Sequence, residues 1–333
     1  MARKLATVTS ARVPATQTNF PIYIDQDRLG MTTLAEAQSG RWYTASDLVT
    51  EMAREVVSVT EGHGKHPSLT STAQICIDWD GVRSDYATTA TYGRNAVWSD
   101  YEFVAHNLIS DSTGNGYDAA SNNTGVAGSP KIGAARSFNG SNQQIVLPVS
   151  STAIENSFGD FSVSVWMNTP SGQTPDSQVL GNYTGTSISP NQYWMLRSRS
   201  NGAISSLFRR DGNAENMNVT SDPINDGLWH HVVSVKDGKD VNLKVDSSDV
   251  GIPASFSTDG NTNNNRDVGM GMTYGRYYEG SIDEARIRKS VLSNNWITTE
   301  YNNQNANGSF WEATDAGGGA AAQAARRGVV MMM

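Results

Sequence analysis

One stretch restricts the possible folds of this chain more than any other, the run DGLWHHVVSVKDGKDVNLKVD at residues 226–246. Its two segments, residues 229–236 and 241–246, alternate with a period of two, which is typical of β-strands with one face turned inward. Asp237-Gly238 lies between them, and glycine tolerates the positive φ of a tight turn. We therefore expect a β-hairpin here, within a protein built from sheets.

Several other segments of the second half show the same kind of pattern. In FSVSVWMN, residues 161–168, the odd positions form one face and the even positions the other. Residues 192–199 and 203–210, joined by Asn201-Gly202, predict a second hairpin. Residues 294–301 predict a short helix with Ser293 as its N-cap.

The order of these motifs resembles that of a known fold family. The motifs are Asp-Ser-x-Gly-Asn-Gly at residues 111–116, Phe-Asn-Gly at 138–140, Gly-x-Trp-His-His-Val at 227–232 and Gly-x-Ile-Asp-Glu-x-Arg-Ile at 280–287. From about Val97 to Trp311, the chain is similar to laminin-G-like, or concanavalin A-like, lectin domains. This resemblance implies a two-sheet jelly roll. Together with the β-rich pattern of residues 1–95, it predicts that the whole chain is all-β.

Residues 1–95 form a separate β-rich region. It resembles an uncharacterised β-sandwich domain found in phage and bacterial surface proteins, through VPATQTNFPIYID, EMAREVVSV and ATTATYGRNAVWSDYEFVAH. Only Thr44 to Arg54 could form a helical turn or two, and residues 41–59 around it suit loop and strand equally well. Gly62-His63-Gly64 predicts a break. We therefore expect a β-sandwich at 1–95, which is the anchoring or assembly domain, and a jelly roll at 96–314.

Residues 315–333, DAGGGAAAQAARRGVVMMM, form a Gly/Ala-rich tail. Two interpretations are open. The tail is disordered, as termini usually are, or it docks on a neighbouring subunit and buries its apolar end, because an exposed run of this kind promotes association.

Composition limits the partners. The net charge of −8 argues against nucleic acid, since phosphate binding needs a basic surface. No segment approaches the ~20 apolar residues of a membrane span, so we expect no membrane insertion. Cys76 is the single cysteine and predicts a buried thiol. No signal peptide follows Met1, which favours a protein finished in the cytosol, as a virion component is.

The sequence does not show the carboxylates that glycoside hydrolysis needs. Such enzymes place two carboxylates about 5–9.5 Å apart across the scissile bond, and on a strand these must share a face. Asp283 and Glu284 are adjacent, so their side chains are expected to point to opposite faces. Asp78 and Asp80 have suitable spacing, but we interpret them as a solvated strand end. We therefore predict a protein that is not an enzyme.

Four histidines are candidate metal ligands. His230 and His231 are adjacent and face apart on a strand, so they cannot hold one metal together. The resemblance makes the pair structural, with one ring beside Trp229 and the other at the surface. His63 and His66 fall in the glycine-rich segment EGHGKHP, where further ligands are not identifiable.

The resemblance also implies a structural Ca²⁺ ion near the last strand of the jelly roll. Calcium takes six to eight oxygen ligands, and Asp283 with Asn139 and Asp111 would supply some of them. Asn139 stands where the family usually has aspartate, which removes a charge. The alternative is that Asp283 accepts hydrogen bonds from loop amides. Apart from this Ca²⁺ no cofactor is expected.

Aromatic rings stack on sugar faces, and arginine or asparagine side chains bind hydroxyl groups. The predicted glycan ligands are Tyr183, Trp194, Arg197, Arg209, Asn213, Tyr274, Arg276, Tyr277 and Tyr278. For any one of them the alternative is packing within the sheets. The same surface also suits a subunit interface, where Tyr, Trp and Arg are enriched.

We therefore predict a non-enzymatic phage virion protein, a head-decoration, head-fibre or tail-fibre subunit, whose lectin-like domain adheres to host-surface glycans. Its partners would be copies of itself, other virion proteins and the glycan, and it would lie on the virion surface after assembly in the host cytoplasm. The alternatives are a purely capsid-stabilising protein, a bacterial adhesin at the cell surface, and a glycoside hydrolase of the same fold.

Overall fold

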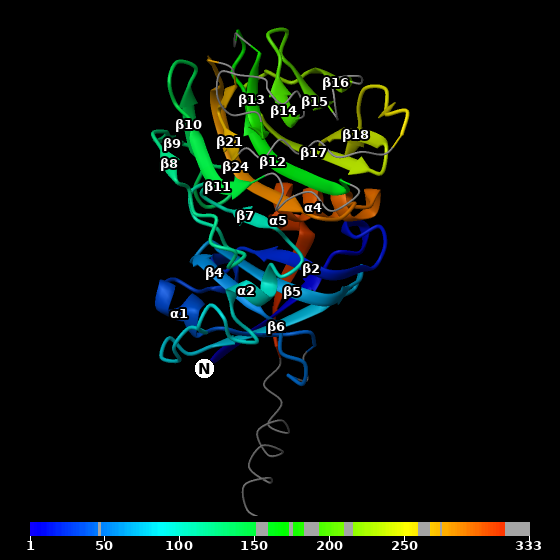
Figure 1. Cartoon of the computed structure of the whole chain (residues 1–333). Helices are drawn as coiled ribbons and strands as arrows, with labels where there is room; N and C mark the ends of the chain where they lie inside the picture. The colour runs from blue at the N-terminus through cyan, green and yellow to red at the C-terminus, as the bar shows by residue number, and fades with distance from the viewer. Residues whose placement is uncertain are drawn as a thin grey trace, which may run out of the picture. The chain divides into compact units, whose positions relative to one another are not determined.

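The computed structural model describes residues 1–45, 48–150, 159–172, 176–182, 193–209, 216–258, 267–273 and 275–316. The chain divides into two compact units (Figure 1). Among the described residues, Met1–Val97 and the chain from Asn302 to Ala316 make the first unit, and Trp98–Tyr301 makes the second. None of the described helices has the length and apolar character that crossing a membrane requires.

The first unit contains two antiparallel sheets, as far as the described residues show. One has the order β25-β1-β6-β3, with strands β25 (Trp311–Asp315), β1 (Ala2–Val8), β6 (Gln74–Trp79) and β3 (Arg41–Tyr43). The other has the order β2-β5-β4, with strands β2 (Gln17–Ile24), β5 (Glu61–Leu69) and β4 (Arg54–Ser58). The short helices of this unit are η1 (Ser10–Arg12), η2 (Asp27–Leu29), α1 (Leu34–Ser39), α2 (Arg94–Val97) and α5 (Asn307–Phe310).

The segment predicted to break at Gly62-His63-Gly64 is instead continuous strand within β5. A Cβ atom at Gly64 would come within 2.5 Å of the Trp42 ring, and one at Gly62 within 3.1 Å. The two glycines therefore leave room for the buried indole against the strand. They mark a close approach and not a turn, which corrects the prediction.

Of the alternatives left open for Thr44–Arg54, the described residues show loop and strand and not the helical turn. The described residues of that segment contain no helix, and Arg54 begins β4. The helix lies earlier, at α1, where Thr33 and Glu36 form a capping box: Glu36 N donates to Thr33 Oγ1 at 3.2 Å, and Thr33 N donates to Glu36 Oε2 at 3.1 Å. The sequence Thr-Leu-Ala-Glu carries this signal.

The second unit has two larger sheets in its described residues. The nine-stranded sheet consists of β19 (Ser248–Asp249), β18 (Asp240–Val245), β17 (Trp229–Asp237), β12 (Phe161–Asn168), β24 (Glu279–Arg288), β10 (Arg136–Asn139) and β9 (Gly125–Val126) in that order, with β20 (Ala254–Ser255) beside β18 and β7 (Phe103–Ala105) beside β24. The seven-stranded sheet consists of β16 (Asn216–Pro223), β15 (Ala203–Arg209), β14 (Tyr193–Ser198), β13 (Ser177–Gly181), β21 (Asp267–Met270), β11 (Ile145–Ser150) and β8 (Ser121–Asn122) in that order. A separate hairpin joins β22 (Met272–Thr273) to β23 (Arg276–Tyr277).

Both predicted hairpins are confirmed. β17 pairs with β18 across Gly238, whose φ is +55°, and β14 pairs with β15. The odd positions of β12 are buried in the main core together with residues of both sheets, as their alternation predicted. This core between two antiparallel sheets confirms the all-β, two-sheet fold of the second unit.

Helix α4 (Asn294–Asn305) follows the last long strand. Trp296 N donates to Ser293 Oγ at 3.2 Å, so the predicted N-cap is confirmed. The helix continues four residues beyond the predicted end at Tyr301. Within the second unit, it packs on the outer face of the nine-stranded sheet, where Tyr301 stacks on Trp166 with ring centroids 5.9 Å apart.

Candidate binding face

The outer face of the seven-stranded sheet, turned away from the main core, collects several of the predicted ligand residues. On β14, Trp194 and Leu196 point into the core, so Tyr193, Met195 and Arg197 point outward. Register brings β15 residues opposite each of them, Arg209 opposite Tyr193, Leu207 opposite Met195, and Ser205 opposite Arg197. We call these six residues the arginine face.

The middle of the arginine face is apolar. Tyr193, Met195 and Leu207 form a cluster of their own, apart from the main core, and are between 4 and 9% exposed. Arg197 and Arg209, both half-buried, lie at its two ends. Ser205 is the register partner of Arg197, and Arg209 lies four residues further along β15. The backbone positions that carry the two arginine side chains are therefore about 13 Å apart along the sheet.

A small charge cluster surrounds Arg197. Its Nη1 lies 3.8 Å from Asp176 Oδ2, and Arg199 Nε lies 3.8 Å from the same oxygen. Burial lowers the pKa of Arg197 below its ordinary value, and the nearby cations of Arg199 and Arg276 lower it further, while Asp176 opposes them. Arg276 itself is exposed, on β23. The guanidinium groups of Arg197 and Arg199 therefore share the Asp176 carboxylate near one end of the face, and Arg276 is within electrostatic reach of Arg197.

The structure accounts for the predicted glycan ligands unequally. Arg197 and Arg209 lie on the arginine face, Arg276 lies near Arg197, and Tyr277 is half-buried next to Arg276. The predictions at Tyr183, Asn213 and Tyr274 lie outside the described residues.

The prediction is wrong for Trp194 and Tyr278, because their rings are 1% and 0% exposed in the main core. The hydroxyl of Tyr278 lies 2.9 Å from Thr169 Oγ1, and its ring contacts Phe138 with centroids 5.8 Å apart. Burial raises the pKa of this hydroxyl. A ring enclosed in this way presents no face to a sugar.

The predicted calcium ligands are spread along β24. Asn139 pairs with Glu279, four residues before Asp283 and therefore about 13 Å along the strand. Asp111 lies beside β7, where its Oδ1 accepts from Val104 N at 3.4 Å. Calcium binds its ligands at about 2.3–2.6 Å, so Asn139 and Asp283 cannot share one ion. That part of the prediction is wrong.

Asp283 is instead surrounded by backbone donors. Its Oδ2 accepts from Lys131 N and Ile132 N, each at 2.9 Å, and its Oδ1 accepts from Glu284 N at 2.9 Å. The side chain is fully buried. Burial, and secondly the Glu284 carboxylate, hold the pKa of Asp283 well above its usual range. The residues present therefore suit loop amides and not a cation, while a calcium ion held by Asp111 stays a prediction.

A buried network of charges lies between β24 and α4, and the sequence reasoning missed it. Arg286 donates from Nη2 to Glu284 Oε2 at 2.6 Å and from Nη1 to Glu300 Oε1 at 2.7 Å. Glu284 Oε1 lies 2.7 Å from His106 Nδ1. All four side chains are at most 4% exposed. The pairing of β12 with β24 contains a bulge, because Ser164 pairs with Arg286 whereas Trp166 pairs with Asp283. This bulge interrupts the strict alternation of β24, on which the prediction that Asp283 and Glu284 face opposite sides depended.

The adjacent histidines separate as predicted, one inside and one at the surface. His231 is buried, and its partner ring is Trp166, 5.1 Å away, and not Trp229. His230 is held between two carboxylates, with Nδ1 2.7 Å from Asp246 Oδ2 and Nε2 3.2 Å from Asp226 Oδ1. These hydrogen bonds raise the pKa of His230, Asp246 contributing most.

Comparison with known proteins agrees with this architecture. Residues 139–298 match the family model of the concanavalin A-like lectin/glucanases superfamily. No curated protein matches the sequence. The second unit thus contains a laminin-G-like, concanavalin A-like domain, as its motifs predicted.

Three solved structures illustrate the likeness. The binding domain of Paraclostridial Mosquitocidal Protein 1 is 13% identical over 61% of this chain and 52% of that chain, with a TM-score of 0.50. The receptor binding domain of botulinum neurotoxin mosaic serotype C/D is 14% identical over 63% and 51%, also at 0.50. Domain 4 of AbnA, an extracellular arabinanase from Geobacillus stearothermophilus solved with arabinotriose, is 23% identical over 60% and 97%, at 0.48.

This chain therefore spans about half the length of the two toxin binding domains that it resembles. At these identities the likeness to the two toxin binding domains shows a shared fold. The fold hosts both binding domains and glucanases, so any activity must be argued from the residues of this chain.

Proposed function

We propose that the second unit binds a glycan on the arginine face. The observation that carries this proposal is the pairing of Arg197 and Arg199 with Asp176 at one end of that face, with Arg209 at the other end. Guanidinium groups offer five donors in a fixed fork, which suits the oxygens of sugar hydroxyl or carboxyl groups. The lectin-like fold supplies a rigid sheet beneath them.

The test is a glycan array probed with the full chain and with Arg197→Ala. Arg197 is half-buried, and its Nε donates to Ser205 Oγ at 3.4 Å, so its removal takes away a donor from the face without opening the core. We expect retention on the array to fall at least tenfold. Lys289→Ala is the matched control, because Lys289 is exposed and pairs with Glu102 away from this face. Equal binding by Arg197→Ala and the unaltered chain would rule out the arginine face as the site.

The proposed activity is binding without hydrolysis. Asp176, the described carboxylate beside the arginines, is engaged by Arg197 and Arg199 and also accepts from Ser200 N at 2.7 Å. A general acid must direct its carboxyl group to the glycosidic oxygen, whereas these contacts hold the Asp176 carboxylate on donors of the protein itself. Incubation of the chain with its array ligand should release no new reducing ends. Their appearance in proportion to protein concentration would favour the hydrolase alternative.

The proposed setting is the surface of a phage virion, with the first unit attaching the lectin-like unit to copies of itself or to other virion proteins. One sequence-based expectation and one observation support this setting. The motifs of residues 1–95 predict a domain of phage and bacterial surface proteins. The buried Cys76 is free, so the described fold is held together without disulfides. Immunogold labelling of purified particles should decorate the virion surface. Label on uninfected cell envelopes instead would support the adhesin alternative.

A further inference from the structure

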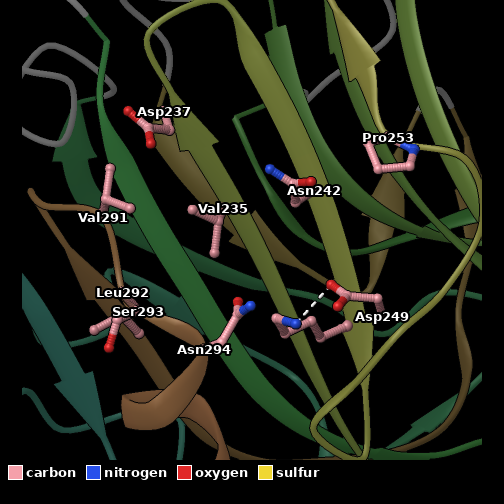
Figure 2. A pocket seen from close by; sticks show the side chains of 10 residues that line it. Val235, Asp237, Asn242, Asp249, Pro253, Val291, Leu292, Ser293 and Asn294 are labelled. Carbon is pink, nitrogen blue, oxygen red and sulfur yellow. Dashed lines mark hydrogen bonds and ion pairs between the residues drawn. The ribbon is translucent and has the colours of Figure 1, made fainter.

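A groove of about 400 Å³ crosses the outer face of the nine-stranded sheet, on the other side of the second unit's core from the arginine face. Its floor consists of Val235 on β17 with Asn242 and Lys244 on β18, and Val235 and Asn242 are register partners. Residues 291–294, which lead into α4, form one side, and Pro253 lies on the opposite side (Figure 2).

Apolar surface lines both the floor and the sides of this groove. Val235 and Leu292 are each 5% exposed and form its inner part. Val291, at 40% exposure, and Pro253 form its edges. These aliphatic groups offer contact area to the C–H bonds of a small ligand, and the volume lies within the range of small-molecule sites.

The polar groups of the groove include both donors and acceptors. The ammonium group of Lys244, 3% exposed as a residue, donates to Asp249 Oδ1 at 2.6 Å (Figure 2). Among the residues that the structure describes, Asp249 is its single hydrogen-bond partner, although an ammonium group carries three hydrogens. Within the same part of the chain, the side chains of Asp237, Asn242 and Asn294 make no hydrogen bond.

The charges of the lining restrict the ligand. Asp237 and Asp249 provide two carboxylates against the single ammonium of Lys244. An anionic ligand would therefore meet repulsion from both carboxylates. Asp249 is already paired with Lys244, so a cationic ligand would gain only the exposed Asp237, and a single exposed ion pair contributes little. A hydroxyl group both donates and accepts, so it can serve a carboxylate, an amide and an ammonium in turn.

We propose that this groove binds a neutral sugar unit, with hydroxyl groups directed to Asp237, Asn242 and Lys244 and a C–H face against Val235 and Leu292. This site is separate from the arginine face and does not depend on it. With two sites on different sheets, the second unit would hold two parts of one glycan or two glycan chains, and the second binding event would benefit from the first.

The test uses saturation-transfer NMR on the full chain with glucose, galactose, mannose and N-acetylglucosamine. The experiment is done in the Arg197→Ala variant, so that the arginine face does not contribute. We expect one or more of these sugars to receive saturation. Adding Val291→Trp, which fills the groove from its exposed edge, should reduce the transfer to the level of a buffer control. Adding Val126→Trp instead, at a 72% exposed position elsewhere in the second unit, should leave it unchanged.

Two results would overturn the inference. One is that Arg197→Ala shows no transfer to any of the four sugars, which leaves the arginine face to be judged by the array alone. The other is that transfer persists when Val291→Trp is added. Loss of array binding in Arg197→Ala together with retained transfer to a neutral sugar would instead show two independent sites.

Discussion

At the scale of single residues, Arg286 is the centre of the buried charge network of the second unit. Its guanidinium group binds the carboxylates of Glu284 and Glu300 at 2.6 and 2.7 Å, and all three side chains are at most 2% exposed. Its Cζ atom also lies 5.0 Å from the ring centroid of Trp98. A buried ion pair adds little net stability compared with apolar residues, but breaking it leaves uncompensated charge. The strength of this network therefore depends on keeping all its members.

Arg286→Met should lower the free energy of unfolding of the second unit by about 3–5 kcal/mol, because Glu284 and Glu300 would remain buried without their cation. Urea denaturation at pH 7 measures the change. Arg288→Met is the matched control, since Arg288 is two residues further along β24. Its Nη2 lies 3.9 Å from Asp100 Oδ2, and this ion pair is more exposed than the Arg286 network. The control should lose about 1 kcal/mol or less. Equal losses in the two variants would contradict the role given to the buried network.

His66 makes the first unit sensitive to acid. Its Nδ1 accepts from Ser68 N at 3.2 Å, which requires a neutral ring, and burial lowers its pKa to about 4. The unfolded chain binds the proton near pH 6.5. Stability is therefore lost as the pH falls from about 6.5 to about 4, with a total on the order of 3 kcal/mol.

His66→Gln should remove this part of the pH dependence, because glutamine keeps an acceptor without titrating. Urea denaturation at pH 7 and pH 4.5 should show a smaller loss between the two pH values in the variant than in the unaltered chain. His231, whose pKa burial lowers to about 3, acts in the same direction in the second unit and remains in both proteins. An unchanged pH dependence would exclude His66 as its source.

At the scale of elements, the hairpin of β17 and β18 is encoded locally in the sequence. It also carries the charge clamp, by which we mean His230 held between Asp246 and Asp226. Its alternation and its Asp237-Gly238 turn lie within one short stretch, so the sequence alone predicts it, as it does the β14–β15 hairpin and the cap of α4. The bulge in β24 could not be predicted in this way. It depends on Glu284 adopting a φ of +51° beside partners that are distant in sequence.

The same distinction applies to the candidate sites. Arg197 and Arg209 were predicted because guanidinium groups bind sugar hydroxyls. That both lie on one outer face follows from their neighbours Trp194, Leu196 and Phe208, which point into the core. Trp194 and Tyr278 were misassigned because an aromatic side chain suits a core as well as a sugar, and only the packing of both sheets decides between them. The groove combines β17, β18 and residues 291–294, whose proximity no local pattern indicates.

Asp226→Asn should lower the pKa of His230, because it removes one of the two carboxylates that favour the charged ring while keeping the acceptor for Leu228 N. The raised pKa stabilises the fold below about pH 6.5 and loses this effect as the pH rises through the folded value. NMR titration of the ring measures the shift, with His66 as the internal control. If the pKa of His230 is the same in both proteins, Asp226 does not contribute to raising it.

At the scale of the whole molecule, the path of the chain between the units was the feature least accessible from sequence. The second domain was predicted to extend to residue 314, but the segment from Asn302 onward lies in the first unit. There β25 pairs with β1, Trp311 opposite Val8, more than 300 positions apart. The first unit is therefore completed only after the second has been synthesised, and such distant pairing has no signature in either strand alone.

Trp311 tests whether this late segment holds the first unit together. Its ring is fully buried, Arg28 Cζ lies 3.8 Å from its centroid, and its Nε1 donates to Asn307 Oδ1 at 3.1 Å. Trp311→Ala should therefore lower the free energy of unfolding of the first unit by about 3–5 kcal/mol. Glu312→Ala, an exposed change on the same strand, should stay within about 0.5 kcal/mol. Because the second unit has its own core, we expect binding to the glycan array to survive in Trp311→Ala at temperatures where the first unit has unfolded. Loss of glycan binding at the temperature where the first unit unfolds would show that the two units fold as one.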